Sequence, residues 1–151
     1  ILRSGCYLTH DHVRYHQHLQ QVGARLGQAQ TLQPALELIS AVQSCPEPGL
    51  ALLTMGKRDV SYDLDLPVPL WRAQPADTQT LPVPSHWRVV ALNDQHAHLR
   101  YDASSPVAEH PRVGQIVGSG ISHPCTTFDK WRWMPVVDEA YRVIDAITIH
   151  C

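Results

Sequence analysis

Turn-forming residues divide most of this chain into short apolar runs, and that division constrains its fold more than any other feature. Residues 35–42 and 49–55 are two such runs, separated by the strong turn signal Cys45-Pro46-Glu47-Pro48-Gly49. Runs of this length, closed by a tight turn, predict a β-hairpin rather than long helices. Further runs of the same kind predict strands over residues 87–92, 96–101, 115–121, 131–137 and 141–149.

Two segments depart from this strand pattern. Val13, Leu19, Val22 and Leu26 recur at roughly helical spacing and Gly27 follows them, which predicts a helix over about residues 10–26. Residues 66–84 contain five prolines, and we expect an ordered surface loop there because proline disfavours helix and central strand. One leading helix and about seven short strands indicate a mainly β domain, an antiparallel barrel or sandwich.

Composition excludes several classes of partner. With 12 Lys and Arg against 14 Asp and Glu, the chain has no basic field for nucleic acid. Its apolar runs are far shorter than the roughly 20 residues that cross a bilayer, so we expect no membrane partner. It opens at Ile1 without Met or a signal peptide and reads as part of something longer. Four scattered cysteines fit a reducing, cytoplasmic setting.

His123 and Cys125 form the most informative chemical pair. Imidazole nitrogen and thiolate together suit Zn²⁺, and two protein ligands would leave positions for water or substrate, as in catalytic sites. The two side chains can reach one point only if the backbone bends around Pro124. Taken alone, an H-x-C motif is more often a loop histidine beside a small buried cysteine.

Other polar groups carry weaker signals. His12 and His16 would share a helix face, but a solvated face that uses histidine is the favoured interpretation over metal binding. Ser4-Gly5-Cys6-Tyr7 can hold a phosphate through backbone N–H groups and a phenol, although, taken alone, a turn before a packed Tyr is the favoured interpretation. Lys57 stands in a charged turn, which favours a solvated or ion-paired lysine over a catalytic one.

Four segments, taken in order, resemble one enzyme family. They are residues 2–11 (LRSGCYLTHD), 46–53 (PEPGLALL), 56–61 (GKRDVS) and 120–131 (GISHPCTTFDKW). In this order and spacing they resemble the C-terminal portion of the D-threonine aldolase and D-serine dehydratase family, especially members labelled amino acid deaminases. The resemblance extends over nearly the whole chain.

The resemblance implies an alanine racemase architecture, in which a (β/α)₈ barrel carrying pyridoxal phosphate precedes an antiparallel β barrel or sandwich. Residues 1–26 would be the last strand and helix of the (β/α)₈ barrel. Residues 27–151 would be a metal-binding, D-serine dehydratase-like β domain. Family members usually pair head to tail, so a homodimer is expected.

The same resemblance assigns roles to individual residues. Gly5, Cys6 and Tyr7 match the segment that meets the cofactor phosphate, and His123 and Cys125 match the pair that holds zinc in dehydratase-type members. Aldolase-type members commonly carry Asp at the second position, which suits the harder Mn²⁺ or Mg²⁺. Cys125 therefore favours zinc and dehydration.

The implied function is ammonia release from a D-serine-like amino acid to give a keto acid. Neither Lys57 nor Lys130 matches the family's Schiff-base lysine, so we expect that lysine outside this chain and no activity from the chain alone. Two alternatives stay open: a retro-aldol enzyme that splits D-threonine or 3-hydroxyaspartate, and a β binding domain without chemistry.

Overall fold

The computed structural model describes residues 5, 8–27, 32–77 and 79–150. In chain order the elements are α1 (Arg14–Leu26), β1 (Glu37–Glu47), β2 (Leu50–Leu53), β3 (Val68–Ala73), β4 (Leu81–Pro82), β5 (Arg88–Leu92), β6 (Ala97–Arg100), the 3₁₀ helix η1 (Val107–Glu109), β7 (Ile116–Gly120), α2 (Pro124–Phe128), β8 (Trp133–Val137) and β9 (Val143–Thr148). The predicted hairpin and the later strands are confirmed, whereas α2 was not predicted.

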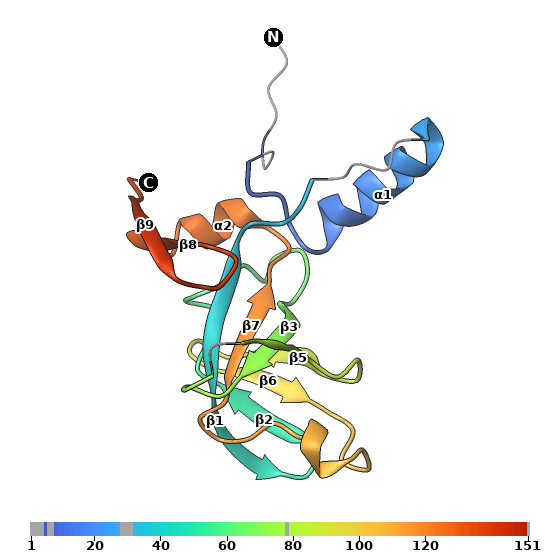
Figure 1. The fold of residues 1–151 in the computed structure, drawn as a ribbon, viewed down its shortest axis with the longest axis vertical. Coiled ribbons are helices and arrows are strands. Elements are labelled where there is room, and N and C mark those ends of the chain that lie inside the picture. Colours follow the sequence, from blue (N-terminus) through green and yellow to red (C-terminus); the bar gives the residue numbers. More distant parts are fainter. Residues whose placement is uncertain (1–4, 6–7, 28–31, 78, 151) are drawn as a thin grey trace.

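Seven strands form one antiparallel sheet in the order β4-β3-β7-β1-β2-β6-β5, and β8 and β9 form a separate hairpin. The long strand β1 joins the two halves of the sheet (Figure 1). Its first five residues pair with β7, and the residues from Val42 onward pair with β2. The prediction of a mainly β, antiparallel fold is confirmed.

The sheet is curled rather than flat. Register shifts after Val42 and after Ser44 mark irregularities of the kind that bend a strand. Arg72 of β3 lies over the ring of Trp87, which immediately precedes β5, with 5.4 Å between the guanidinium carbon and the ring centroid. Strands β3 and β5, which stand near opposite ends of the sheet order, therefore approach each other, as in a barrel-like domain.

The core lies on the inner face of this curled sheet. Burial alternates along β1, β2 and β6, as the two-residue period of a half-buried strand requires. The fully buried apolar side chains include Ala51, Leu53, Val60, Leu99, Val117 and Ile121. Each large one contributes roughly 1.5–3 kcal/mol through removal of its apolar surface from water.

The predicted helix is confirmed, but it begins at Arg14 rather than near residue 10. The buried carboxylate of Asp11 accepts hydrogen bonds from the backbone N–H groups of Val13 and Tyr15 at 2.8 and 3.1 Å, so this side chain caps the helix start. Gly27 ends the helix in the left-handed conformation, with φ of 64°.

The prediction that residues 66–84 form only a loop is wrong, because β3 lies inside the sheet. Pro69 is tolerated there for a geometric reason. Strand β4 pairs with Trp71 and Arg72, so within the described residues no strand lies beside Pro69 on that edge, and the β3–β7 register shifts directly after it.

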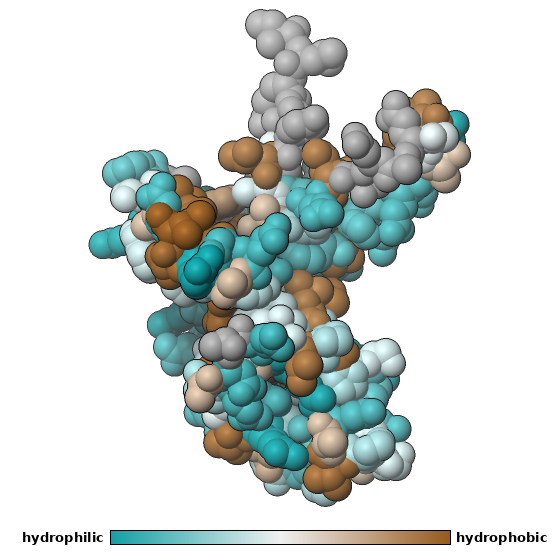
Figure 2. Space-filling model, viewed as in Figure 1, coloured by the Kyte–Doolittle hydropathy of each residue, from teal (hydrophilic) through white to brown (hydrophobic). Residues whose placement is uncertain are grey.

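The β8–β9 hairpin is tied to the sheet through one carboxylate. Oε2 of Glu37 accepts hydrogen bonds from Trp71 Nε1 at 2.7 Å and from the Tyr141 hydroxyl at 2.9 Å. Tyr141 lies in the turn between β8 and β9, and its ring centroid is 4.7 Å from that of Trp71. Every residue of β9 is exposed, and Figure 2 shows apolar side chains gathered over the hairpin. Within the described residues, no helix is long and apolar enough to cross a membrane.

Candidate functional site

The H-x-C motif lies where β7 leaves the sheet and α2 begins. Ile121 and Ser122 are buried after the end of β7, and His123 occupies the N-cap position of α2 with extended backbone angles. Pro124 follows as the first helical residue, a position where its missing N–H costs nothing. The bend that the sequence analysis required between His123 and Cys125 is therefore the start of a helix, with Cys125 exposed in its first turn.

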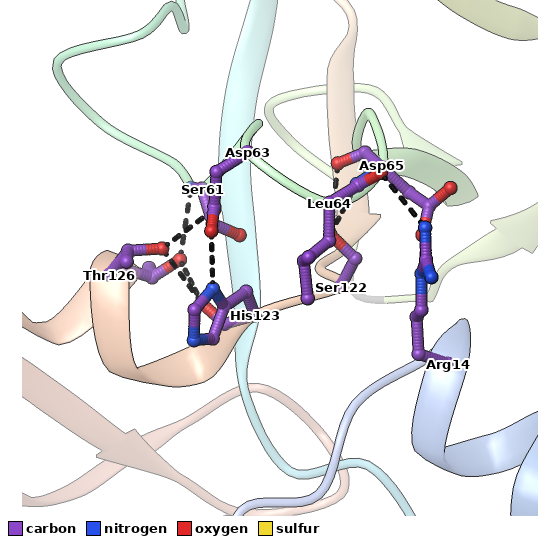
Figure 3. A network of polar contacts seen from close by, with 9 residues as sticks. Arg14, Ser61, Asp63, Leu64, Asp65, Ser122, His123 and Thr126 are labelled. Carbon is purple, nitrogen blue, oxygen red and sulfur yellow. Dashed lines mark hydrogen bonds and ion pairs between the residues drawn. The ribbon is translucent and has the colours of Figure 1, made fainter.

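The His123 side chain is held by a carboxylate from a distant loop. Its Nδ1 lies 2.6 Å from Oδ2 of Asp63, and Oδ1 of the same carboxylate accepts a hydrogen bond from the Thr126 hydroxyl at 3.1 Å (Figure 3). Asp63 thus contacts the residue before α2 and a residue within it. Both ends of the His123–Asp63 pair are partly open to solvent, with 28% and 44% of the side chains exposed.

The charge on Asp63 follows from these contacts. Desolvation would raise the pKa of the carboxyl, but it is outweighed by the hydrogen bonds from His123 and Thr126 and by the attraction of the imidazole, so the pKa falls below its usual value. Asp63 is an anion near neutral pH, suited to accept the Nδ1–H of a histidine. That arrangement leaves Nε2 as the ring nitrogen with a lone pair for a ligand.

The loop that carries Asp63 is fixed to the site on both sides. The backbone N–H of Ser61 donates to the Thr127 hydroxyl at 3.0 Å. The Ser122 hydroxyl donates to the backbone carbonyl of Asp65 at 2.9 Å and accepts from the backbone N–H of the same residue at 3.2 Å (Figure 3). Asp63 therefore sits between two anchored points, which limits how far its carboxylate can move from His123.

The start of the same loop places Lys57 at the protein surface. A Cβ on Gly56 would overlap the backbone at Asp94 and Gln95, so only glycine lets the loop approach the β5–β6 turn this closely. The ammonium of Lys57 lies 5.6 Å from the centre of the Tyr62 ring, and that of Lys130 lies 5.5 Å from it. These are exposed cation–π contacts, in keeping with a surface role for both lysines.

The N-terminal histidines do not share a helix face. His12 precedes α1, donates its backbone N–H to the carbonyl of Ile121 at 2.9 Å and packs so closely on Gly120 that a Cβ there would overlap its ring. Burial lowers the pKa of His12, which favours the neutral ring. His16 lies within α1 and its Nε2 is 2.9 Å from the side-chain nitrogen of Gln20.

The structure describes only part of the predicted phosphate segment. Gly5 has no atom within 4 Å of the position that a Cβ would take, whereas Cys6 and Tyr7 lie outside the described residues. Across the described part of the chain, no three His, Cys, Asp or Glu side chains are grouped so that they could hold a metal ion. Among the described residues, the predicted ligands His123 and Cys125 therefore have no third side chain of these types grouped with them.

Asp63 and Thr126 were missed in the sequence analysis. Asp63 is 60 residues from His123 in the chain, and no motif spacing links the two positions. The only available signal was an acidic loop, Tyr62-Asp63-Leu64-Asp65, after the GKRDVS segment.

Comparisons with known proteins identify the family and the fold of this chain. A family model described as "Putative serine dehydratase domain" matches residues 35–137, which is more than half of the chain. A comparison with curated proteins finds no significant match.

Two solved structures share the fold. The crystal structure of D-threonine aldolase from Filomicrobium marinum is similar with a TM-score of 0.62 and 19% identity, over 80% of this chain and 29% of that one. A variant of D-threo-3-hydroxyaspartate dehydratase, described as in the metal-free form, is similar with a TM-score of 0.57 and 14% identity, over 78% of this chain and 33% of that one. The chain thus spans about a third of the length of the solved structures that it resembles.

Proposed function

The chain belongs to the family of serine dehydratase domains, and from that premise we propose that it is the metal-bearing β domain of a pyridoxal-phosphate-dependent lyase. The reaction we propose is dehydration and deamination of a D-serine-like amino acid to a keto acid and ammonia. The substrate is a small D-hydroxyamino acid. Residues 1–26 would belong to the cofactor-binding barrel and residues 27–151 to the β domain.

One observation supports the proposed metal site most directly. Histidines that bind zinc almost always donate their second ring N–H to a carboxylate, a carbonyl or water, and His123 has such a carboxylate in Asp63 at 2.6 Å. Cys125, one helical residue beyond Pro124, adds a thiol, which binds zinc as the thiolate. The donor set of this chain therefore fits Zn²⁺ better than Mn²⁺ or Mg²⁺, which prefer oxygen ligands.

The residues of this chain would perform two tasks. The imidazole of His123 and the thiolate of Cys125 would hold zinc at the start of α2, while Asp63 keeps the imidazole oriented. Gly5, Cys6 and Tyr7 would meet the cofactor phosphate through backbone N–H groups and the phenol. Pyridoxal phosphate, when bound, supplies the electron sink for α-proton removal.

Neither lysine described above is positioned as the Schiff-base residue. Lys57 and Lys130 both lie over the exposed Tyr62 ring at the protein surface. We propose that the lysine belongs to the barrel portion, so that residues 1–151 alone are inactive. A cytoplasmic location is part of the same proposal.

We also propose that the full-length protein is a homodimer. The support is the β8–β9 hairpin, where Trp133, Val143 and Ile144 are 53%, 66% and 65% exposed. Large apolar side chains left exposed on one hairpin are typical of a contact with another protein surface. Sedimentation analysis of the full-length protein tests this, and a monomer at all concentrations would refute it.

Product analysis separates the reaction classes. The full-length protein, loaded with pyridoxal phosphate and Zn²⁺, is incubated with D-serine and with D-threonine. Dehydration predicts keto acid and ammonia in equal amounts. Glycine without ammonia would establish the alternative of a retro-aldol enzyme. The similarity to a D-threonine aldolase structure is the reason to test this alternative.

Metal analysis tests the site separately from the reaction. We expect one zinc per chain in the full-length protein and its loss in His123→Ala and Cys125→Ala. A protein that binds no zinc, and whose Cys125→Ala variant behaves as wild type, would instead be a β domain without this chemistry.

A further inference from the structure

Asp63 lies outside the H-x-C motif, yet its carboxylate contacts the imidazole ring of His123 directly. The Nδ1–Oδ2 distance of 2.6 Å is short for a nitrogen–oxygen hydrogen bond, as expected when one partner is charged. A neutral imidazole carries its proton on one nitrogen and a lone pair on the other, and the hydrogen-bond partner decides which. An ionised carboxylate has no proton to donate, so at this distance it accepts from the imidazole and holds the proton on Nδ1.

The carboxylate is itself held in place. Thr126 donates its hydroxyl to Oδ1 of Asp63 at 3.1 Å, so each oxygen of the carboxylate has a separate donor. Thr126 lies within α2, one residue after Cys125. The orientation of the imidazole is thereby coupled to the helix turn that carries the second proposed ligand.

We propose that Asp63 is the positioning residue of the metal site: it fixes His123 in the Nδ1–H form and in one ring orientation, with Thr126 as its support. The ligand is a divalent cation that accepts nitrogen and sulfur, Zn²⁺ above all. This inference rests on the proposed function, because it assigns Nε2 of His123 to the metal.

The decisive variant is Asp63→Asn. The amide has the size and shape of the carboxylate, so packing is kept, but it is neutral and can present its NH₂ group to Nδ1, which favours the opposite tautomer. The same replacement of a histidine-orienting Asp in serine proteases leaves the geometry intact and produces the wrong tautomer. Loss of such a partner typically weakens metal binding by about 10- to 100-fold.

Asp65→Asn is the matched control. It lies two residues further along the same loop, its carboxylate is also exposed, and it pairs with Arg14 at 2.7 Å rather than with His123. In the full-length protein, the zinc dissociation constant is measured by competition with a chelator. Binding of Co²⁺ is followed through the absorption that a cobalt–thiolate bond produces, and the melting temperature is measured without metal.

We expect Asp63→Asn to weaken zinc about 10- to 100-fold with an unchanged metal-free melting temperature, and Asp65→Asn to bind zinc as the wild type does. Thr126→Val, which removes only the support, should weaken zinc less than Asp63→Asn. A wild-type zinc affinity in Asp63→Asn overturns the proposal, because a merely space-filling role predicts that result.

Two further outcomes are also informative. If Asp63→Asn lowers the metal-free melting temperature, the zinc affinity of Thr126→Val becomes the deciding measurement. A wild-type zinc affinity in Thr126→Val would then overturn the proposal that Thr126 and Asp63 together orient His123. If wild type, His123→Ala and Cys125→Ala all bind zinc equally, the proposed metal site itself fails, which is distinct from failure of the role of Asp63.

Discussion

Removal of the Tyr141 hydroxyl tests how the β8–β9 hairpin is attached to the sheet. In Tyr141→Phe, the hydrogen bond of 2.9 Å to Glu37 is lost, while Trp71 continues to donate to the same oxygen at 2.7 Å. A hydrogen bond to a charged group contributes about 1.5–3 kcal/mol. Because the carboxylate keeps one donor, we expect a loss at the lower end, about 1.5 kcal/mol in the free energy of unfolding.

The pH dependence gives a second, independent signature of this hydrogen bond. Burial, together with the hydrogen bond to Glu37 and the negative charge of that residue, raises the pKa of Tyr141 from 10.0 to about 12. The folded state therefore keeps a proton that the unfolded chain releases. The stabilisation is fully present below pH 10.0 and is lost as the pH rises through about 12.

Urea unfolding of wild type and Tyr141→Phe, followed by tryptophan fluorescence, measures both effects. Tyr15→Phe, a change at an exposed tyrosine of α1, serves as the control. The stability difference between wild type and Tyr141→Phe should shrink between pH 10.0 and about 12. A loss below about 0.5 kcal/mol near neutral pH, the range of ordinary surface substitutions, would refute the reasoning, as would a difference that stays constant in alkali.

Three further predictions concern the sheet and the loop that carries Asp63. Gly118→Ala places a Cβ inside the Trp71 ring and should destabilise the protein by about 1–3 kcal/mol, measured as a lower melting temperature. Leu53→Ala should cost about 2–5 kcal/mol in urea unfolding, because the side chain is fully buried in the core. Ser122→Ala removes the hydroxyl bound to the backbone of Asp65, so amide hydrogen exchange in this loop should accelerate, and unchanged exchange would contradict its anchoring role.

The strands could be predicted because their signals are local. The turn signal at residues 45–49 between two apolar runs predicts a hairpin without reference to the rest of the chain, and in the structure β1 and β2 pair antiparallel across it. Strand β3 could not be predicted in this way. Its Pro69 argues against a central strand, and this proline is tolerated only because β4 pairs no further along β3 than Trp71 and Arg72.

The start of α1 and the existence of α2 show a second limit. The helix was predicted from about residue 10, but the carboxylate of Asp11 caps it from outside, so α1 starts at Arg14. Strand β7 ends at Gly120, where the absence of a side chain leaves room for the ring of His12. These two residues are more than a hundred positions apart in the chain. Sequence periodicity carries no information about such contacts.

The sequence by itself identified the H-x-C pair, the antiparallel β architecture and the family resemblance, because turn chemistry, apolar period and motif order are all readable along one chain. Only the tertiary structure brought Asp63 to His123, 60 residues apart, and supported that carboxylate with Thr126. The physical reason is that a ligand's orientation depends on hydrogen-bond partners in space, and the loop anchored at Ser61 and Asp65 supplies them.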